Sequence, residues 1–234
     1  MKNIEVCLTP ELIHLYELSD KTVVIVDIFR ATSCMTTGMA HGVAEIMPFA
    51  SLEECRAKKD QGYITAGERG GKKVADFDMG NSPFGYMNEK LKEKKIAVTT
   101  TNGTVAIEKS KGARDVVIGS FLNKKAIVNY LIEQPNDILI VCAGWKGRFS
   151  LEDTLFAGAL VASLYEKTET TCDTALAAQI LYDREKNDLF TFLSNSAHAK
   201  RLSKIGITKD IAFCLEENKY DVVPVLKNGA IRLA

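Results

Sequence analysis

The sequence predicts an α/β fold with three layers, α/β/α, in which helices cover both faces of a mixed, mostly parallel sheet. Short segments rich in branched apolar residues alternate with segments of helical periodicity over most of the chain. Residues 151–204 are almost wholly helical in pattern, which predicts a helix-rich C-terminal half. No Pro- or Ser-rich linker interrupts the chain, so residues 1–234 are expected to form a single domain or two closely joined lobes.

The strands are expected where short apolar segments are bounded by polar or glycine-containing turns. These segments are residues 4–8, 22–27, 45–49, 96–99, 116–118, 138–141 and 222–225. Helices are expected between them where apolar residues recur at helical spacing. These helices are residues 11–17, 31–40, 52–60, 104–110 and 124–132, followed by the helical region 151–204 with its small-residue surfaces AGALVAS and ALAAQ.

Composition excludes several classes of protein. The chain has 234 residues, 46% of them hydrophobic, which is enough to bury a substantial core. Lys and Arg total 30, as do Asp and Glu, so no overall basic field attracts nucleic acid or an anionic membrane. We find no signal peptide and no membrane-spanning run, and therefore expect a cytoplasmic location. The six cysteines lack the paired spacing of a zinc site and are expected to be thiols.

The segment CAGWKGRFSLED, residues 142–153, is the most informative part of the chain. It follows the apolar strand at 138–141 and is first glycine-rich, then basic, then acidic. Ser150 begins the next helical pattern. Ligands of open α/β sheets bind at the carboxyl ends of the strands, and a helix that follows offers unpaired N–H groups to an anion. This loop is therefore predicted to contribute to a binding site.

Two similar junctions are expected at the same edge of the sheet. In VVIVDIFRATS, Asp27 and Arg30 lie just past a strand, and in KIAVTTTNGT, residues 99–104 open the next helix. The shorter polar motifs GERGGKK, GNSP and GSFLN separate other apolar segments. Because the carboxyl ends of parallel strands share one edge, these motifs are expected to converge.

The ordered set DIFRATS, GER, NSP, TTNGT, GS with a following Asn, CAG with FSLED, and SNSAH resembles the 2-phosphosulfolactate phosphatases. The likeness runs from about residue 23 to about residue 198, with weaker agreement around Asp210 and Cys214. It implies a magnesium-dependent phosphomonoesterase that hydrolyses 2-phospho-3-sulfolactate to 3-sulfolactate and phosphate, an early step in making coenzyme M. The implied partner is this small anionic phosphorylated substrate, and the sequence is compatible with a homo-oligomer.

Carboxylates are the expected magnesium ligands, because this ion prefers oxygen donors and binds through one or two acids plus a phosphate. Asp27 ends a buried strand, where an unpaired carboxylate would be costly, so a cation or an arginine must lie beside it. Glu68 is expected in a flexible glycine-rich loop, as a ligand or as a solvated acid. Glu152 and Asp153 lie in the first turn of a helix, which favours acids in any case. Asp153 is the preferred third ligand.

Basic residues are expected to bind the acid groups of the substrate. Arg30 and Arg148 are assigned to catalysis, and Arg69 and Lys146 to substrate binding, because guanidinium forks match oxyanions and lysine adds a mobile charge. The alternative for Arg30 is an ion pair with Asp27. His198 matches the SNSAH motif and is expected to protonate the leaving oxygen, or else to be a structural histidine. The remaining expected contacts to substrate are Thr101, Asn102, Gly103, Thr104, Ser120, Gly144 and Ser150.

Other readings of the site remain open. Cys142 and Arg148 have the spacing of the cysteine-dependent phosphatases, in which a thiolate attacks phosphorus. Phe149 stands where that motif has Ser or Thr, and no general-acid aspartate is apparent. An aspartyl nucleophile at Asp27 is less favoured, since Phe29 stands where a second aspartate is expected. A non-catalytic protein that binds a phosphorylated metabolite would use the same loops.

Overall fold

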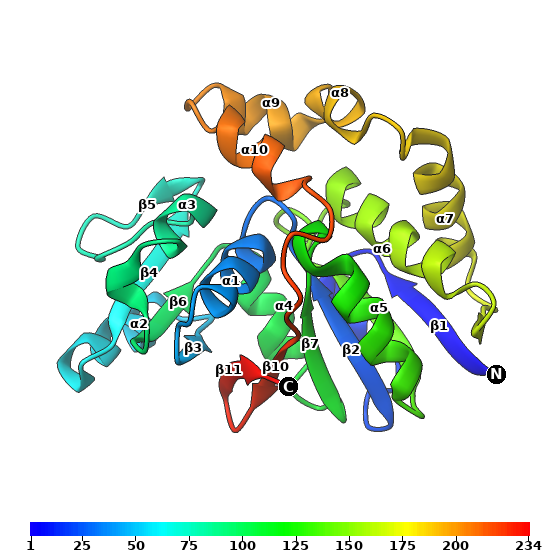
Figure 1. Ribbon diagram of the computed structural model, residues 1–234, viewed down its shortest axis with the longest axis horizontal. Coiled ribbons are helices and arrows are strands. Elements are labelled where there is room, and N and C mark those ends of the chain that lie inside the picture. The colour runs from blue at the N-terminus through cyan, green and yellow to red at the C-terminus, as the bar shows by residue number, and fades with distance from the viewer.

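The computed structural model describes residues 1–234 and contains one sheet with the strand order β5-β4-β6-β3-β11-β10-β7-β2-β8-β1-β9 (Figure 1). The strands are β1 (Lys2–Cys7), β2 (Lys21–Val26), β3 (Glu45–Pro48), β4 (Ile64–Arg69), β5 (Lys72–Lys73), β6 (Lys95–Thr99), β7 (Asp115–Gly119), β8 (Asp137–Cys142), β9 (Thr168–Glu169), β10 (Pro224–Lys227) and β11 (Ala230–Leu233). The expected mixed, mostly parallel sheet of an α/β fold is confirmed.

The sheet consists of two parallel groups joined by the C-terminal hairpin. Strands β4, β6 and β3 form one group, and β7, β2, β8, β1 and β9 form the other. The hairpin β10–β11 lies between them and pairs antiparallel with β7 on one side and with β3 on the other. The last strands of the chain therefore close the middle of the sheet.

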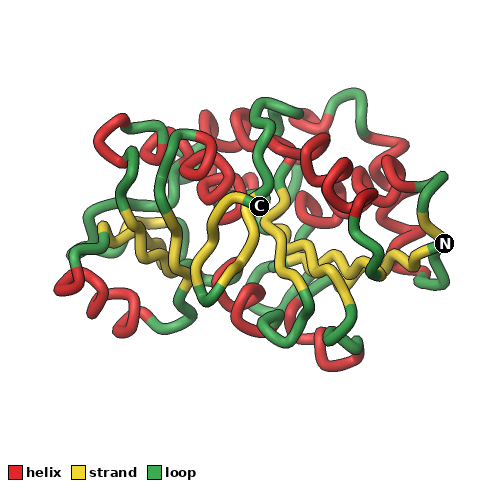
Figure 2. Tube along the Cα trace, turned by 60° about the horizontal axis from the view of Figure 1, so that its bottom comes forward, coloured by secondary structure: helices red, strands yellow, loops and turns green.

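Helices cover both faces of the sheet (Figure 2). They are α1 (Ala31–Ala40), α2 (Leu52–Ala57), α3 (Pro83–Tyr86), α4 (Gly103–Lys109), α5 (Lys124–Glu133), α6 (Leu151–Leu164), α7 (Asp173–Glu185), α8 (Leu189–Ser194), α9 (Ala197–Ser203) and α10 (Thr208–Cys214). Short 3-10 helices span Pro10–Leu15, Lys58–Gln61, Glu89–Leu91 and Phe121–Asn123. None of the helices combines the length and apolar character needed to cross a bilayer.

Successive residues of the central strands belong to two different cores. In β2, Val24 and Val26 pack in the core that includes α5, α6 and α7, whereas Val23 and Ile25 pack in the core that includes α1 and α4. This alternation follows from the period of two residues in a strand. Because both faces of β2 are buried, its sequence is continuously apolar, and the sequence pattern predicts it well.

The small residues of α6 and α7 allow their backbones to touch. A Cβ atom added at Gly158 would lie 2.0 Å from the carbonyl oxygen of Ala178, so no larger residue fits at that crossing. The small-residue surfaces AGALVAS and ALAAQ form this contact, as their composition predicts. Helices α8, α9 and α10 continue from this pair across the top of the molecule in Figure 1, above the loops that follow the strands.

Two expectations about local structure are wrong. Glu68 and Arg69 end strand β4, which the sequence analysis did not predict, and so do not lie in a flexible loop. The four residues from Thr65 to Glu68 are all buried although two of them are polar, so the segment lacks the apolar alternation of a strand. Residues 11–17 form only the 3-10 helix Pro10–Leu15.

Candidate active site

The carboxyl ends of β2, β4, β6 and β8 meet around two neighbouring cavities. The inner cavity has a volume of about 20 Å³, and the outer cavity about 430 Å³. The inner cavity is lined by Asp27, Phe29, Arg30, Glu68, Gly71, Asn81, Asn102, Trp145, His198, Arg201 and Leu202. The outer cavity is lined by Trp145, Arg148, Phe149, Ser150, Leu151, Glu152, Ser196, Ala197, His198 and Arg201. Trp145, His198 and Arg201 form the wall that both cavities share.

Asp27 lies at the inner cavity directly after β2. Its Oδ1 atom accepts a hydrogen bond from the backbone N–H of Ala31 at 3.3 Å, which holds the carboxylate at the start of α1. Burial raises the pKa of Asp27 to about 6, against the opposing attraction of His198. Gly103 makes the close approach of α4 tolerable, because a Cβ atom there would lie 2.7 Å from the Asp27 Oδ2 atom.

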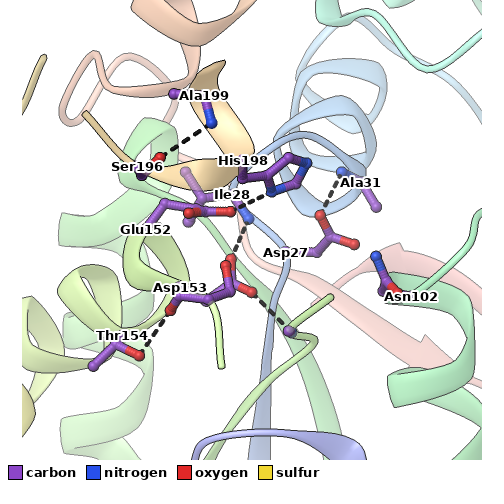
Figure 3. A network of polar contacts seen from close by, with 12 residues as sticks. Asp27, Ile28, Ala31, Asn102, Glu152, Asp153, Thr154, Ser196, His198 and Ala199 are labelled. Atoms are coloured by element: carbon purple, nitrogen blue, oxygen red, sulfur yellow. Dashed lines mark hydrogen bonds and ion pairs between the residues drawn. The ribbon is translucent and has the colours of Figure 1, made fainter. Parts of the chain in front are cut away.

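Glu152, which lines the outer cavity, and His198, on the shared wall, form a largely buried pair. His198 Nδ1 donates to Glu152 Oε1 at 2.5 Å, and only 1% of the Glu152 side chain is exposed (Figure 3). Burial is the largest single influence and would raise the pKa of Glu152, but the hydrogen bond from His198, its electrostatic attraction and weaker local hydrogen bonds together hold that pKa below its ordinary value. The imidazole lies between Phe29 and Trp145, with ring centroids 6.0 and 5.6 Å away. The ring is thereby fixed, with its Nε2 atom unbonded.

Asp153 connects two loops of the site instead of facing a cavity. Its Oδ1 atom accepts from the N–H of Ile28 at 2.9 Å, and its Oδ2 atom accepts from the N–H of Gly144 at 3.1 Å (Figure 3). Burial and the neighbouring charges of Glu152 and Asp27 raise its pKa well above the ordinary range. Of the two adjacent acids, the structure places Glu152 on a cavity wall and Asp153 behind it.

Glu68 is held in the inner cavity by backbone donors. Its Oε2 atom accepts from the N–H of Gly71 at 2.6 Å, and its Oε1 atom accepts from the N–H of Thr101 at 2.7 Å. The next residue points elsewhere, since Arg69 donates to the Glu68 carbonyl and to the Thr99 hydroxyl and lines neither cavity. The strand geometry of β4 explains this division, because successive side chains point to opposite faces.

The expected magnesium ligands are only partly brought together. No cluster of three or more His, Cys, Asp or Glu side chains in the structure has the geometry to hold a metal ion. Asp27 and Glu68 line the same cavity, whereas Asp153 lines neither cavity. Magnesium is commonly held by one or two carboxylates, with water and phosphate completing its shell. Asp27 and Glu68 fit that mode of binding, and Asp153 does not.

The basic residues of the expected site have different environments. Arg30 is 5% exposed and forms an ion pair with Asp210 at 2.5 Å, so its carboxylate partner lies on α10 and is not Asp27. Arg148 is exposed on the outer cavity and makes no ion pair. The exposed Lys146 places its ammonium 5.4 Å from the centroid of the Trp145 ring, and its backbone N–H donates to the Asn102 side-chain oxygen.

Of the remaining residues expected to contact the substrate, some line a cavity and others do not. Asn102 lines the inner cavity, and Ser150 lines the outer one with its buried Oγ atom unbonded. Gly144 adopts a positive φ of 62°, which lets the loop return toward Arg148. The others lie outside both cavity linings: Thr104 exchanges hydrogen bonds with Thr100, Thr101 donates its N–H to Glu68, and the fully buried Ser120 bonds to Asn123 and Thr36.

Sequence reasoning missed several cavity residues, of which Trp145, Arg201 and Asn81 matter most. Arg201 follows His198 by three residues on α9, so the helical repeat places both on one face. That spacing was a usable signal. Asn81 lies in the GNSP motif, and Trp145 lies in the 142–153 segment, but neither residue type has one characteristic chemistry.

Cys142 is poorly suited to nucleophilic attack. The thiol is fully buried at the end of β8, and burial raises its pKa well above the ordinary value. A thiolate nucleophile needs the opposite shift, because only the ionised form attacks. Neither cavity is lined by Cys142.

Comparison with known proteins identifies the family. The family model described as 2-phosphosulpholactate phosphatase matches residues 7–229. A protein of Thermotoga maritima is 42% identical over 213 residues, covering 91% of this chain and 92% of the relative. One from Caldanaerobacter subterraneus subsp. tengcongensis is 40% identical over 222 residues, covering 92% of each. One from Clostridium tetani is 34% identical over 234 residues, covering 98% of this chain and all of the relative. Each is named "Probable 2-phosphosulfolactate phosphatase". The chain belongs to the 2-phosphosulfolactate phosphatase family.

Proposed function

We propose that the protein is a magnesium-dependent phosphomonoesterase that hydrolyses 2-phospho-3-sulfolactate to 3-sulfolactate and phosphate, in coenzyme M biosynthesis or a related pathway. The names of its relatives support this substrate. The observation that carries the proposal is His198, which lines the same cavity as Asp27 and Glu68 and is held there by its hydrogen bond to Glu152. A cytoplasmic location is part of the proposal and is supported by six free cysteine thiols.

Asp27 and Glu68 would hold the magnesium ion. When bound, it would neutralise the charge of the phosphate. The backbone donors at Ala31, Gly71 and Thr101 fix the two carboxylates before any ligand arrives. Such preorganisation avoids the cost of reorienting charged groups during the reaction.

His198 is the proposed general acid. Glu152 accepts the Nδ1–H hydrogen bond and so leaves Nε2 as the atom that, when it carries a proton, transfers it to the leaving oxygen of sulfolactate. The aromatic rings of Phe29 and Trp145 prevent the imidazole from rotating away. The role of Glu152 in this scheme is to position His198, without contacting the substrate phosphate.

Arg148 contributes a guanidinium to the outer cavity, where it is free of any carboxylate partner. Arg30 carries its charge into the inner cavity while Asp210 holds it in place. A phosphate ester with two further acid groups needs several cations, and these residues together with magnesium supply them. A non-catalytic sensor would need the arginines but not the Glu152–His198 pair.

The test is release of inorganic phosphate from a panel of phosphorylated carboxylates and sulfonates, with and without magnesium. We expect 2-phospho-3-sulfolactate to be hydrolysed fastest and excess chelator to abolish turnover, with recovery when magnesium is restored. The Lys200→Met variant is a suitable control, since Lys200 is exposed and lines neither cavity. Full activity in excess chelator contradicts the metal requirement, and binding without turnover of any ester supports the sensor.

A further inference from the structure

We propose that Arg201 is a specificity-determining residue that binds an acid group of the substrate other than its phosphate. This inference rests on the proposed function and adds a residue to it that neither the motifs nor the names of the relatives assign. The juxtaposition that supports it is a guanidinium stacked on Trp145 at the wall between an acid-lined inner cavity and an outer cavity.

The guanidinium of Arg201 is oriented before any ligand binds. Its Cζ atom lies 3.7 Å from the centroid of the Trp145 ring, which is a stacking distance. Stacking fixes the plane of the guanidinium and leaves its N–H edge available for a planar or tetrahedral oxyanion. Arg201 is partly buried, and its Nη2 atom is buried, so that end of the guanidinium faces the protein and not bulk solvent.

The hydrogen-bonding capacity of Arg201 is not used within the chain. Its Nη2 atom is buried and has no hydrogen-bond partner. Arg30 in the same inner cavity is paired with Asp210, and Arg69 donates to Glu68 and Thr99. Glu152 and Glu68 attract Arg201 through space, but neither forms an ion pair with it. A buried donor without a partner costs free energy, and a bound oxyanion would remove that cost.

The position of Arg201 matches the shape of the proposed substrate. Its phosphate needs the inner cavity, where Asp27 and Glu68 would repel further acid groups in the absence of a cation. The carboxylate and the sulfonate are one or two carbon atoms away from the ester oxygen, so they must lie near the shared wall when the phosphate is inside. Arg148 and Arg201 are the two basic residues other than His198 that line the outer cavity. Arg201 alone of these two also reaches the inner cavity.

The experiment compares Arg201→Met with the wild type on three phosphate esters. These are 2-phospho-3-sulfolactate, 2-phospholactate, which lacks the sulfonate, and the phosphate ester of 2-hydroxyethanesulfonate, which lacks the carboxylate. Methionine keeps an apolar stem against Trp145 and removes the charge. We expect kcat/KM for the full substrate to fall about 10- to 150-fold, mostly through KM, as for loss of a charged hydrogen bond. For the ester that lacks the group bound by Arg201, the Arg201→Met substitution should lower kcat/KM much less.

The pattern of losses identifies the group. A small loss on 2-phospholactate means that Arg201 binds the sulfonate, and a small loss on the hydroxyethanesulfonate ester means that it binds the carboxylate. Equal losses on all three esters, or none, would overturn the proposal. Lys200→Met is the matched control, because it removes a positive charge from the same helix without touching either cavity, and it should leave all three values unchanged.

Failure of the proposed function would be visible separately, as no phosphate release by the wild type from any of the three esters. In that case, calorimetric measurement of 3-sulfolactate binding, which needs no turnover, tests whether Arg201 binds an acid group of the ligand. Binding that weakens at least 10-fold in Arg201→Met and is restored in part by Arg201→Lys supports the anion site. Binding that is equal in wild type and Arg201→Met, or absent from both, overturns it.

Discussion

The inner and outer cavities share a wall but differ in size, in charge and in how many of their polar groups already have hydrogen-bond partners. The inner cavity, of about 20 Å³, contains two carboxylates already held by backbone N–H groups. The outer cavity, of about 430 Å³, has an unpaired arginine and the unbonded hydroxyl of Ser150. The difference indicates a division of work. Under the proposed function, the inner carboxylates would take part in the chemistry, and the outer groups would bind the rest of the substrate.

This division predicts how variants behave. Changes to the inner cavity should lower kcat, because they remove interactions made with the reacting phosphate. Changes to the outer cavity should raise KM, because they remove binding that is similar before and during the reaction. His198 belongs to both cavities and should follow the inner pattern.

Asp27→Asn tests the inner cavity and has the largest expected effect. The amide keeps the shape of the side chain and removes the charge, so kcat should fall on the order of 10³-fold, as for loss of a major electrostatic group. The fold should not suffer, because burial already disfavours the ionised carboxylate. Steady-state kinetics and thermal unfolding check both statements. A variant that loses activity together with several degrees of Tm would mark Asp27 as structural.

His198→Asn tests whether the shared wall supplies the proton. General acid catalysis contributes about 10²- to 10⁴-fold, so kcat for an alkyl phosphate should fall by at least about 10²-fold. An aryl ester such as p-nitrophenyl phosphate leaves without protonation and should be affected far less. Glu152→Gln should show the same selectivity in weaker form, since it replaces the carboxylate that orients the imidazole by a weaker hydrogen-bond acceptor. Equal losses on alkyl and aryl esters would exclude the acid role.

The pH dependence of the free energy of unfolding tests how much the buried, ionised carboxylate of Asp27 destabilises the folded state. The folded pKa of Asp27, about 6, exceeds its ordinary value of 3.8, so the folded state binds this proton more tightly than the unfolded state. Its contribution to stability is therefore complete below about pH 4 and lost as the pH rises to about 6. In metal-free protein, Asp27→Asn should gain about 3 kcal/mol relative to wild type between pH 4 and pH 7. Urea unfolding of both proteins at pH 4 and pH 7 measures this difference in the free energy of unfolding. A difference between variant and wild type that is the same at both pH values would refute the prediction.

Arg148→Lys tests the outer cavity. Lysine keeps the charge but loses the two-pronged donor, so kcat/KM should fall by about 1.5–3 kcal/mol in transition-state stabilisation, mainly through KM. Tm should not change, since the exposed Arg148 makes no ion pair. Arg30→Lys provides the contrast. It weakens the buried pair with Asp210 and should lower Tm as well as activity.

Cys142→Ser should have the smallest effect, within about threefold of wild-type kcat with magnesium present. The thiol is buried behind the site, and its raised pKa keeps it protonated. Kinetics and mass spectrometry of acid-quenched wild type check this. A nearly inactive variant together with a phosphocysteine adduct would replace the magnesium scheme with the cysteine mechanism, since a serine alkoxide is much harder to generate.

The parts of the fold that could be predicted are those with a local signal. Strands β2 and β8 are continuously apolar and buried on both faces, so their ends, and hence Asp27 and the 142–153 loop, were located correctly. Strand β4 was missed because it buries Thr65 and Glu68. The position of the C-terminal hairpin between two parallel groups depends on pairings remote in sequence, such as Val225 with Val117. No local pattern contains that information.

Predictions about the site were limited in the same way, because contacts between residues remote in sequence leave no local pattern. The ion pair of Arg30 with Asp210 joins residues 180 positions apart, so a partner near in sequence was expected instead. Glu152 and Asp153 are equivalent to any argument from the helix dipole. Their roles separate because neighbours on a helix point in different directions and the N–H groups of Ile28 and Gly144 face only Asp153.

The central claim is that chemistry belongs to the inner cavity and recognition to the outer one. Its most direct test is the separate determination of kcat and KM for Asp27→Asn and Arg148→Lys on 2-phospho-3-sulfolactate at saturating magnesium. We predict that Asp27→Asn lowers kcat on the order of 10³-fold, and that Arg148→Lys raises KM at least about 10-fold while kcat stays within about threefold. The opposite assignment, with Arg148→Lys acting on kcat and Asp27→Asn acting on KM alone, would contradict the division.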